Sequence, residues 1–338
     1  MSLPPTPPRA IQIATAGEAL IDLIEDADGR LRPCAGGAVY NLSRALGLQG
    51  VGTLYLNPLS RDSFGRLLAA GIEQAGVVLA EASPVHQPTS LAVVGLDAEG
   101  KARYSFYRDG VADRQVTAGE MNQQCAAHPG LRLVATGCLA LVADDSQRYL
   151  PWLQAQRAAG HLVVVDANLR PAIVPDMAAY RASVMAALAQ AHLVKVSDDD
   201  LLTLGFDDAD PLDAARALLA RTPARWLALT LGPRGAVLLA RSGQAWQARE
   251  QAPVRVVDTV GAGDCFLAGM LAALLERPAL QHSTSADDLQ LQANDVQDLL
   301  SRAVASASLC IMQTGCVPPE RAALLARVAQ APAVVQAV

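Results

Sequence analysis

The feature that most constrains the fold is an alternation of short apolar runs and longer helix-like segments from residue 131 onward. The helix-like segments cover 146–159, 178–191 and 210–221, and the apolar runs are LRLVATG, HLVVVDAN, AHLVKVS and RWLALTLG. Continuous apolar strands that alternate with helices are typical of a parallel sheet covered on both faces. We therefore expect an α/β fold with a doubly wound, mainly parallel central sheet flanked by helices.

An earlier segment has a different pattern. Residues 91–110 form two runs with period-two alternation, joined by a polar turn that contains glycine. This pattern predicts a β-hairpin in a sheet with one solvated face. The stretch 11–24 begins as a first strand and reaches Gly17.

Polar residues follow the predicted central strands where each strand ends. They are Asp166 and Asn168, Ser197 to Asp200, and Thr230 with Gly232. Ligands of doubly wound sheets bind beyond the carboxyl ends of the strands. The sequence thus predicts a binding site at this edge.

Composition and charge argue against several classes of protein. The 338 residues carry a formal net charge of −6, and the Lys and Arg residues are scattered, so no nucleic-acid surface is expected. No apolar run approaches the roughly 20 residues of a membrane span. The start lacks the pattern of a signal peptide, and the six cysteines form no CxxC pair. We expect a cytoplasmic protein with reduced cysteines and no structural zinc.

The stretch DTVGAGDCFLAG (258–269) indicates the chemistry. Residues 251–260 have strand-like composition and an apolar helix follows, so the glycine-rich turn should present unpaired N–H groups to an anion. A Walker A loop would need a Lys-Ser/Thr pair after Gly263, and a GxGxxG fingerprint would need glycine where Phe266 stands.

Asp264 directly follows this turn, where a carboxylate would repel a bound phosphate. The helix dipole favours an ionised acid at this position. Such an acid could accept the proton of an alcohol that attacks a phosphoryl group held by the turn. The alternative is that Asp264 only caps its own helix.

The motifs resemble those of the PfkB-type (ribokinase-like) carbohydrate kinases. DTVGAGDCFLAGML resembles the carboxy-terminal signature, GGAVYNLSRALGLQG (36–50) the amino-terminal Gly-Gly-x-x-x-Asn motif, and TLGPRGAVL the nucleotide-site strand and turn. The resemblance runs from about residue 11 to about 320 and implies a ribokinase-like domain over 11–330. It also implies that this domain carries a small β-sheet lid from about 18–35 and 87–113. Outside the domain we expect a disordered tail at 1–10 and a second tail at 331–338.

The resemblance assigns roles at the reacting end of the site. Asp264 would be the catalytic base, and the N–H groups of Gly261, Ala262 and Gly263 would form the anion hole. Asp22 matches an acid at the end of the first strand that binds sugar hydroxyls. The full set of implied sugar-binding residues is Asp22, Gly36, Gly37, Asn41, Arg108 and Arg170.

The resemblance also assigns nucleotide and metal positions. The implied ATP-binding residues are Ser197, Thr230, Gly232, Gly235, Gly261 and Gly263. Asp200 would hold the water shell of Mg²⁺. A monovalent cation such as K⁺ would be bound by Asp258, Val260, Cys310 and Gly315. Gln313 and Cys316 replace the usual Arg and Ala of that region, so a potassium requirement is a hypothesis.

The segments DANLRP, KVSDDD and FYRDGVADR look most like bacterial fructokinases within the family. The leading interpretation is an ATP-dependent kinase that phosphorylates a primary hydroxyl of a ketohexose, converting fructose to fructose 6-phosphate. Both O1 and O6 of fructofuranose are primary alcohols, so the position stays open. An exposed lid edge would allow a homodimer through strand pairing.

Three alternatives remain. A 2-keto-3-deoxygluconate kinase, or another sugar kinase of the family, would share the D-x-N-x-R stretch. A sugar- or nucleotide-sensing protein would bind without turnover, although Asp264 and both anion-hole glycines favour an enzyme. A dinucleotide-binding oxidoreductase is disfavoured by Phe266.

Overall fold

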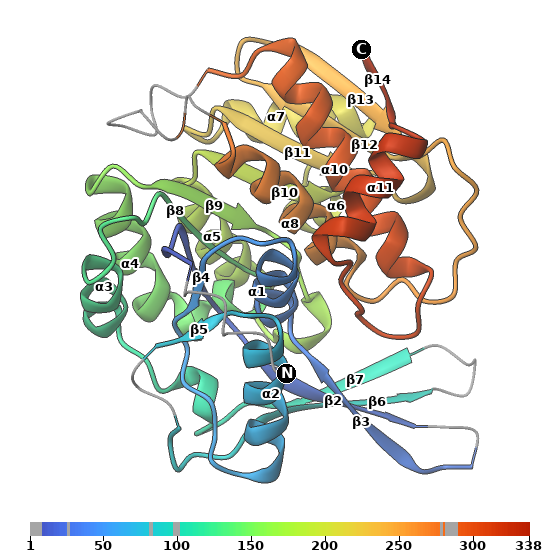
Figure 1. Cartoon of the computed structure of the whole chain (residues 1–338). Coiled ribbons are helices and arrows are strands. Elements are labelled where there is room, and N and C mark those ends of the chain that lie inside the picture. The colour runs from blue at the N-terminus through green and yellow to red at the C-terminus, as the bar shows by residue number, and fades with distance from the viewer. Residues whose placement is uncertain (1–8, 26–27, 81–83, 97–101, 278–279, 281–289) are drawn as a thin grey trace.

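The computed structural model describes residues 9–25, 28–80, 84–96, 102–277, 280 and 290–338. Its body is a large twisted sheet with helices on both faces, and a small second sheet projects from one end (Figure 1). The large sheet contains, in spatial order, β14 (Val334–Ala337), β13 (Ala245–Arg249), β12 (Ala236–Ala240), β11 (Trp226–Thr230), β10 (Leu193–Ser197), β9 (Leu162–Asp166), β8 (Leu133–Gly137), β1 (Ile13–Ala16), β4 (Thr53–Tyr55) and β5 (Val78–Leu79).

Every strand pairing from β5 to β11 is parallel, and the pairings from β11 to β14 are antiparallel. The mainly parallel, doubly wound sheet expected from the sequence is thereby confirmed. The helices are α1 (Ala38–Leu48), α2 (Ser63–Gln74), α3 (Ala118–Ala126), α4 (Ser146–Ala158), α5 (Met177–Leu188), α6 (Asp198–Leu204), α7 (Pro211–Ala220), α8 (Ala262–Leu275), α10 (Ala293–Ile311) and α11 (Arg321–Gln330). Short 3₁₀ turns are η1 (Ala112–Arg114), η2 (Cys138–Leu141), η3 (Ala143–Asp145), η4 (Pro171–Ile173) and η5 (Gly232–Arg234).

Two hydrophobic cores lie on opposite faces of the central strands. In β9, Val163 and Val165 pack on the side of α3 to α7, whereas Leu162 and Val164 pack on the side of α1, α8 and α10. Side chains alternate across a strand, so a strand buried on both faces must be apolar throughout. This is why the central strands appear in the sequence as uninterrupted apolar runs.

The small sheet has the strand order β3 (Leu31–Gly36), β2 (Leu20–Glu25), β6 (Ser90–Leu96) and β7 (Ala102–Tyr107). Strands β6 and β7 pair antiparallel, which confirms the predicted hairpin, although its turn at 97–101 lies outside the described residues. Since β2 follows β1 and leads through β3 into α1, the chain crosses from the large sheet into the small one and back. The small sheet therefore borders the region between β1 and α1.

Two local predictions were wrong. Residues 250–261 contain neither helix nor strand, and Val256 and Val257 are more than half exposed, because this stretch runs past the end of α10, where Val257 N–H donates to the carbonyl of Ile311 at 2.8 Å, and not along a strand. The expected tail at 331–338 instead contains β14, which pairs antiparallel with β13 and closes that side of the sheet. Residues 1–8 and the polar loop expected at 281–288 lie outside the described residues. Among the helices that the structure describes, none has the length and apolar character needed to cross a bilayer.

Candidate functional site

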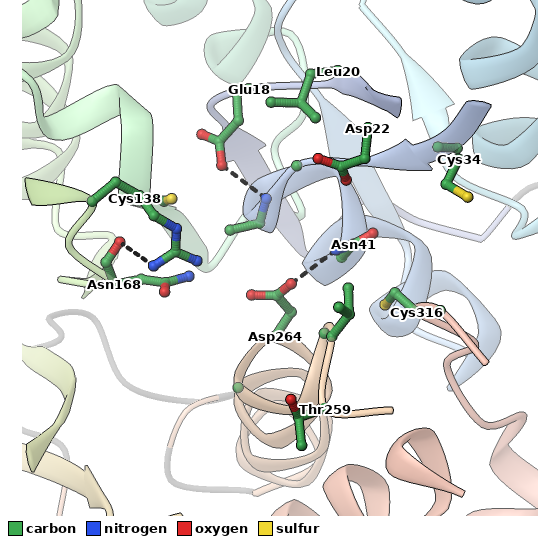
Figure 2. Close-up of a pocket in the computed structure, with 18 of the residues that line it drawn as sticks. Glu18, Leu20, Asp22, Cys34, Asn41, Cys138, Asn168, Thr259, Asp264 and Cys316 are labelled. Carbon is green, nitrogen blue, oxygen red and sulfur yellow. Dashed lines mark hydrogen bonds between the residues drawn. The ribbon is translucent and has the colours of Figure 1, made fainter. Parts of the chain in front are cut away.

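A cavity of about 600 Å³ lies where the small sheet meets the start of α8 (Figure 2). Its walls come from β2 and β3, the start of α1, the segment 168–173 after β9, the turn 258–264 and the loop 314–316. The carboxyl edge of the large sheet, where ligands of such folds bind, forms its floor. Of the polar residues that the sequence places at this edge, Asn168 lines the cavity.

The turn before α8 has the backbone geometry of an anion site. Gly261 is the N-cap with φ 78°, in the left-handed region that favours glycine, and no side chain caps the helix. Ala262 N–H makes only a long bond, 3.3 Å, to the carbonyl of Thr259. The first N–H groups of a helix lack intrahelical acceptors, and both Gly261 and Gly263 line the cavity. A phosphoryl group could be held here.

Asp264 lies in the first turn of α8 and is only 6% exposed. Asn41 of α1 donates an Nδ2 hydrogen bond to its Oδ2 at 3.0 Å, which joins the two motifs seen in the sequence (Figure 2). Burial raises the pKa of Asp264 to about 6, although the Asn41 bond and the charges of Lys195 and Arg170 act in the opposite direction. At neutral pH the side chain is a carboxylate that can accept a proton.

Two acids line the wall opposite Asp264. Asp22 is in β2 of the small sheet, so its expected position at the end of the first strand was wrong, and its pKa is raised to about 6 by burial. Gly36 lies beside it, since a β-carbon there would come within 2.2 Å of Asp22 Oδ2. Glycine at 36 is therefore required for the position of the Asp22 carboxylate.

Glu18 is the acid that directly follows β1, and sequence reasoning missed it. It is 2% exposed; its Oε1 accepts from the N–H of Ala38 at 2.8 Å, and its Oε2 is buried without a hydrogen-bond partner among the described residues. Burial raises its pKa to about 7. Its place immediately after the first strand was the available signal, because that is where ligands of α/β sheets bind.

Lys195 was also missed, because it occurs inside the apolar run of β10. Its Nζ lies 3.0 Å from both carboxylate oxygens of Asp166, and both residues are buried. Despite the burial, which lowers the pKa of an amine, the Asp166 carboxylate raises the pKa of Lys195. A β-carbon on Gly263 would come 2.9 Å from Nζ, so this positive charge lies directly under the anion turn.

The two predicted arginines take different positions. Arg170 lines the cavity and donates to the carbonyls of Asn168 and Leu169. Arg108 instead lines a neighbouring cavity of about 640 Å³ beside β7, and its nearest acid is Asp145 at 3.4 Å. Arg108 therefore is not among the residues that line the main cavity.

Ser197, predicted to bind ATP, and Asp200, predicted to hold the water shell of Mg²⁺, already have partners within the chain. The Ser197 hydroxyl accepts from Asp200 N–H, and Asp200 Oδ2 accepts from Ser197 N–H, which is a capping box at the start of α6. Asp200 Oδ1 accepts from Leu169 N–H at 2.7 Å. Thr230 lies beside Ser197 across β10 and β11. None of these residues lines the main cavity.

Two predicted nucleotide glycines lie in the η5 turn after β11. Gly232 has φ 54° and Gly235 has φ 89°. A β-carbon on Gly235 would come 2.1 Å from the carbonyl of Ala248 in β13. This packing is sufficient to require glycine at 235, whether or not a nucleotide binds there.

The residues expected to hold a monovalent cation do come together. Asp258 accepts through Oδ2 from Gly315 N–H at 2.8 Å and through Oδ1 from Val260 N–H at 3.0 Å. The Cys310 thiol donates to the carbonyl of Val260 at 3.6 Å. These bonds connect the anion turn to the end of α10 and the loop behind it.

An anion-binding turn next to a buried base suits transfer of a phosphoryl group to an alcohol, so the fold and the site together define a small-molecule kinase. A model of the pfkB family of carbohydrate kinases matches residues 10–323, and the chain belongs to this family. It is a sugar kinase.

Similar proteins agree with the family. The chain is 30% identical over 269 residues to a fructokinase of Rhizobium leguminosarum bv. trifolii, covering 78% of this chain and 79% of that protein. It is 33% identical over 267 residues to a fructokinase of Klebsiella pneumoniae, with 78% and 84% covered. A crystal structure of a fructokinase with bound ATP from Xylella fastidiosa superimposes with a TM-score of 0.82 at 26% identity, over 94% of this chain and 98% of that one.

Proposed function

We propose that this protein is a fructokinase that transfers the γ-phosphoryl group of ATP to a primary hydroxyl of fructose, giving fructose 6-phosphate. The observation that carries the chemistry is Asp264, buried beside the glycine turn and hydrogen-bonded to Asn41. The similar fructokinases named above favour fructose as the acceptor, and the related structure with bound ATP favours ATP as the donor.

In the proposed reaction the sugar lies between the small sheet and Asp264. Asp22 and Asn41 would accept and donate hydrogen bonds at its hydroxyls, and Glu18 Oε2 would accept a hydrogen bond from a further hydroxyl. Asp264 would remove the proton of the attacking hydroxyl as the O–P bond forms. The N–H groups of residues 261–263, supported by the charge of Lys195, would stabilise the oxygens of the transferring phosphoryl group.

The residues around the site test two expected ions differently. Mg²⁺ is the usual companion of ATP phosphates, but Asp200 is only 5% exposed and does not line the main cavity, so it does not fit as the residue that holds the water shell of this ion, and we assign no step to it. For K⁺, Asp258, Val260 and Gly315 lie together, because the Asp258 carboxylate accepts from the N–H groups of Val260 and Gly315, and this supports a cation behind the anion turn. Equal activity in sodium, potassium and a large organic cation would remove the K⁺ proposal.

Two further properties belong to this proposal. Leu31 on edge strand β3 and Tyr107 on edge strand β7 are 49% and 61% exposed, which supports a homodimer through the small sheet. Light scattering on the purified protein measures this directly. All six cysteines are free, which fits the reducing cytoplasm.

The test of the function is ADP release from Mg-ATP with fructose, tagatose, ribose, 2-keto-3-deoxygluconate and adenosine. We expect turnover with fructose, and NMR of the product would show phosphate at O6. Preference for 2-keto-3-deoxygluconate would keep the mechanism and change the substrate. Binding of ATP and sugar without turnover of any acceptor would instead indicate a sensing protein.

A further inference from the structure

Three cysteines that are far apart in the sequence come together beside the anion turn. Cys265 is in the first turn of α8, Cys310 is near the end of α10, and Cys316 is in the loop that follows. Their three sulfur atoms all lie within 4.8 Å of one another. Cys265 and Cys310 are buried, whereas Cys316 is partly exposed and lines the main cavity. A ligand in the cavity therefore has access to the cluster through Cys316.

The sulfur positions suit a thiophilic cation. Zn²⁺ binds thiolates at ~2.3 Å, which places three sulfurs about 3.8–4.0 Å apart around one ion. The observed cluster needs only a small contraction to reach that geometry. Two carboxylates are close to the cluster, because Asp264 directly precedes Cys265 in α8 and Asp258 accepts from the N–H of Gly315, the residue before Cys316. Soft sulfur ligands discriminate against Mg²⁺ and K⁺.

We propose that Cys265, Cys310 and Cys316 form a binding site for one thiophilic divalent cation of the Zn²⁺ and Cd²⁺ class, and that its occupancy inhibits the kinase. Each coordinating thiol loses its proton to solvent as its sulfur bonds to the ion, and no electron is transferred. The Cys310 thiol now donates to the Val260 carbonyl, so loss of its proton also frees that oxygen. This site uses the three thiols and shares Cys310 with the set of residues expected for K⁺.

The contacts of Cys316 connect this site to the chemistry. A β-carbon on Gly261 would come 2.2 Å from Cys316 Sγ, so this sulfur packs against the backbone of the anion turn. Cys265 directly follows Asp264 in α8. Drawing the three sulfurs toward one ion moves Cys316 relative to Gly261 and changes the spacing of the N–H groups. Positioning of the phosphoryl group dominates this chemistry, and small displacements there lower turnover.

The test uses Cd²⁺ with the reduced full-length protein, because cadmium thiolates absorb in the ultraviolet. We expect one Cd²⁺ per chain, with an absorption of three thiolates and release of the thiol protons. Cys316→Ser and Cys265→Ala should each lose one thiolate's share of the absorption and bind more weakly. Cys34→Ser is the matched control, since Cys34 is a half-buried thiol in another wall of the same cavity, and it should keep the full absorption.

Sugar-dependent ADP release then measures the consequence. Cd²⁺ should inhibit the wild-type protein, a chelator should restore activity, and Cys316→Ser should be resistant. The proposal is overturned by an absorption that the two cluster variants, Cys316→Ser and Cys265→Ala, leave unchanged or that Cys34→Ser removes. Binding without inhibition overturns its regulatory half. Because the absorption does not depend on the sugar, an error in the proposed substrate leaves this outcome readable.

Discussion

The two ends of the site differ in how their buried polar groups are paired. At the small sheet, Glu18 Oε2 and Asn41 Oδ1 are buried without a partner among the described residues. At the ends of β10 and β11, Ser197 and Asp200 bind each other's backbone and Asp200 also binds Leu169. An unpaired buried polar group is costly, which indicates that a ligand normally supplies the missing bond.

This comparison indicates which polar residues are available to bind a ligand and which are already used within the protein. Glu18 did not stand out in the sequence, yet it has the spare acceptor that a hydroxyl ligand requires. Ser197 does match a motif position, but its hydroxyl caps α6. A sequence motif therefore cannot distinguish a residue that caps a helix from one that contacts a ligand. The hydrogen bonds in the structure make this distinction.

The largest effect is expected for Asp264, the proposed catalytic base between the two ends of the site. Asp264→Asn keeps the size of the side chain and an acceptor for Asn41, but it removes the proton acceptor. Turnover should fall about 10²- to 10⁴-fold, the usual contribution of a general base, with little change in sugar affinity. Steady-state kinetics with a thermal melt of the same sample measures both. Near-normal turnover in a folded variant would contradict the assignment.

Lys195→Met should have the next largest effect, because it removes the charge beneath Gly263 and leaves Asp166 buried and unpaired. Loss of one partner from a buried ion pair costs about 3–5 kcal/mol of stability. The double variant Lys195→Met/Asp166→Leu should recover stability in denaturant unfolding but not turnover. Recovery of both would show that Lys195 has only a structural role.

Glu18→Gln tests the end of the site beside the small sheet, where Glu18 Oε2 has no partner among the described residues. The variant keeps an acceptor for Ala38 N–H but loses the carboxylate oxygen that we propose for a sugar hydroxyl. Above the Glu18 pKa of about 7 the side chain is charged, and a hydrogen bond to a charged group is worth about 1.5–3 kcal/mol, so the KM for fructose measured above that pH should rise roughly tenfold or more. The KM for ATP should stay constant. An unchanged fructose KM would indicate that Glu18 only holds the start of α1.

The dependence of the reaction rate on pH should follow the ionisation of Asp264. Asp264 has a pKa raised to about 6, so it is protonated below that pH and cannot accept the hydroxyl proton. The kcat/KM for fructose, which reports the groups of the ligand-free enzyme, should fall about tenfold for each pH unit below this value. The residual rate of Asp264→Asn should lack this limb. If both proteins show the same acidic limb, another group controls it.

Ser197→Ala should have the smallest effect. It removes the capping hydroxyl of α6 and should cost about 0.5–2 kcal/mol of stability, while the KM for ATP changes little. Thermal unfolding and ATP titration measure the two effects. A large rise in the KM for ATP without loss of stability would break the comparison and support a phosphate contact at Ser197.

Local pattern was sufficient for much of this protein. Strand and helix periodicity determined the parallel sheet and the hairpin of the small sheet, because burial on one or two faces directly shapes residue order. The glycine turn with Asp264 also marked the reacting end, since its chemistry needs adjacent residues. Local pattern failed at 250–260 and at β14, where strand formation depends on whether a neighbouring edge is available.

The remaining parts were decided by tertiary structure. Asn41 contacts Asp264, Lys195 approaches Gly263, and Cys265 meets Cys310 and Cys316, although each pair or group is widely separated along the chain. The sequence predicted no site for a thiophilic metal ion, because its cysteines are far apart and form no CxxC pair. Packing of α8 against α10 brings them together, and contacts of this kind depend on how whole elements meet rather than on residues close in sequence.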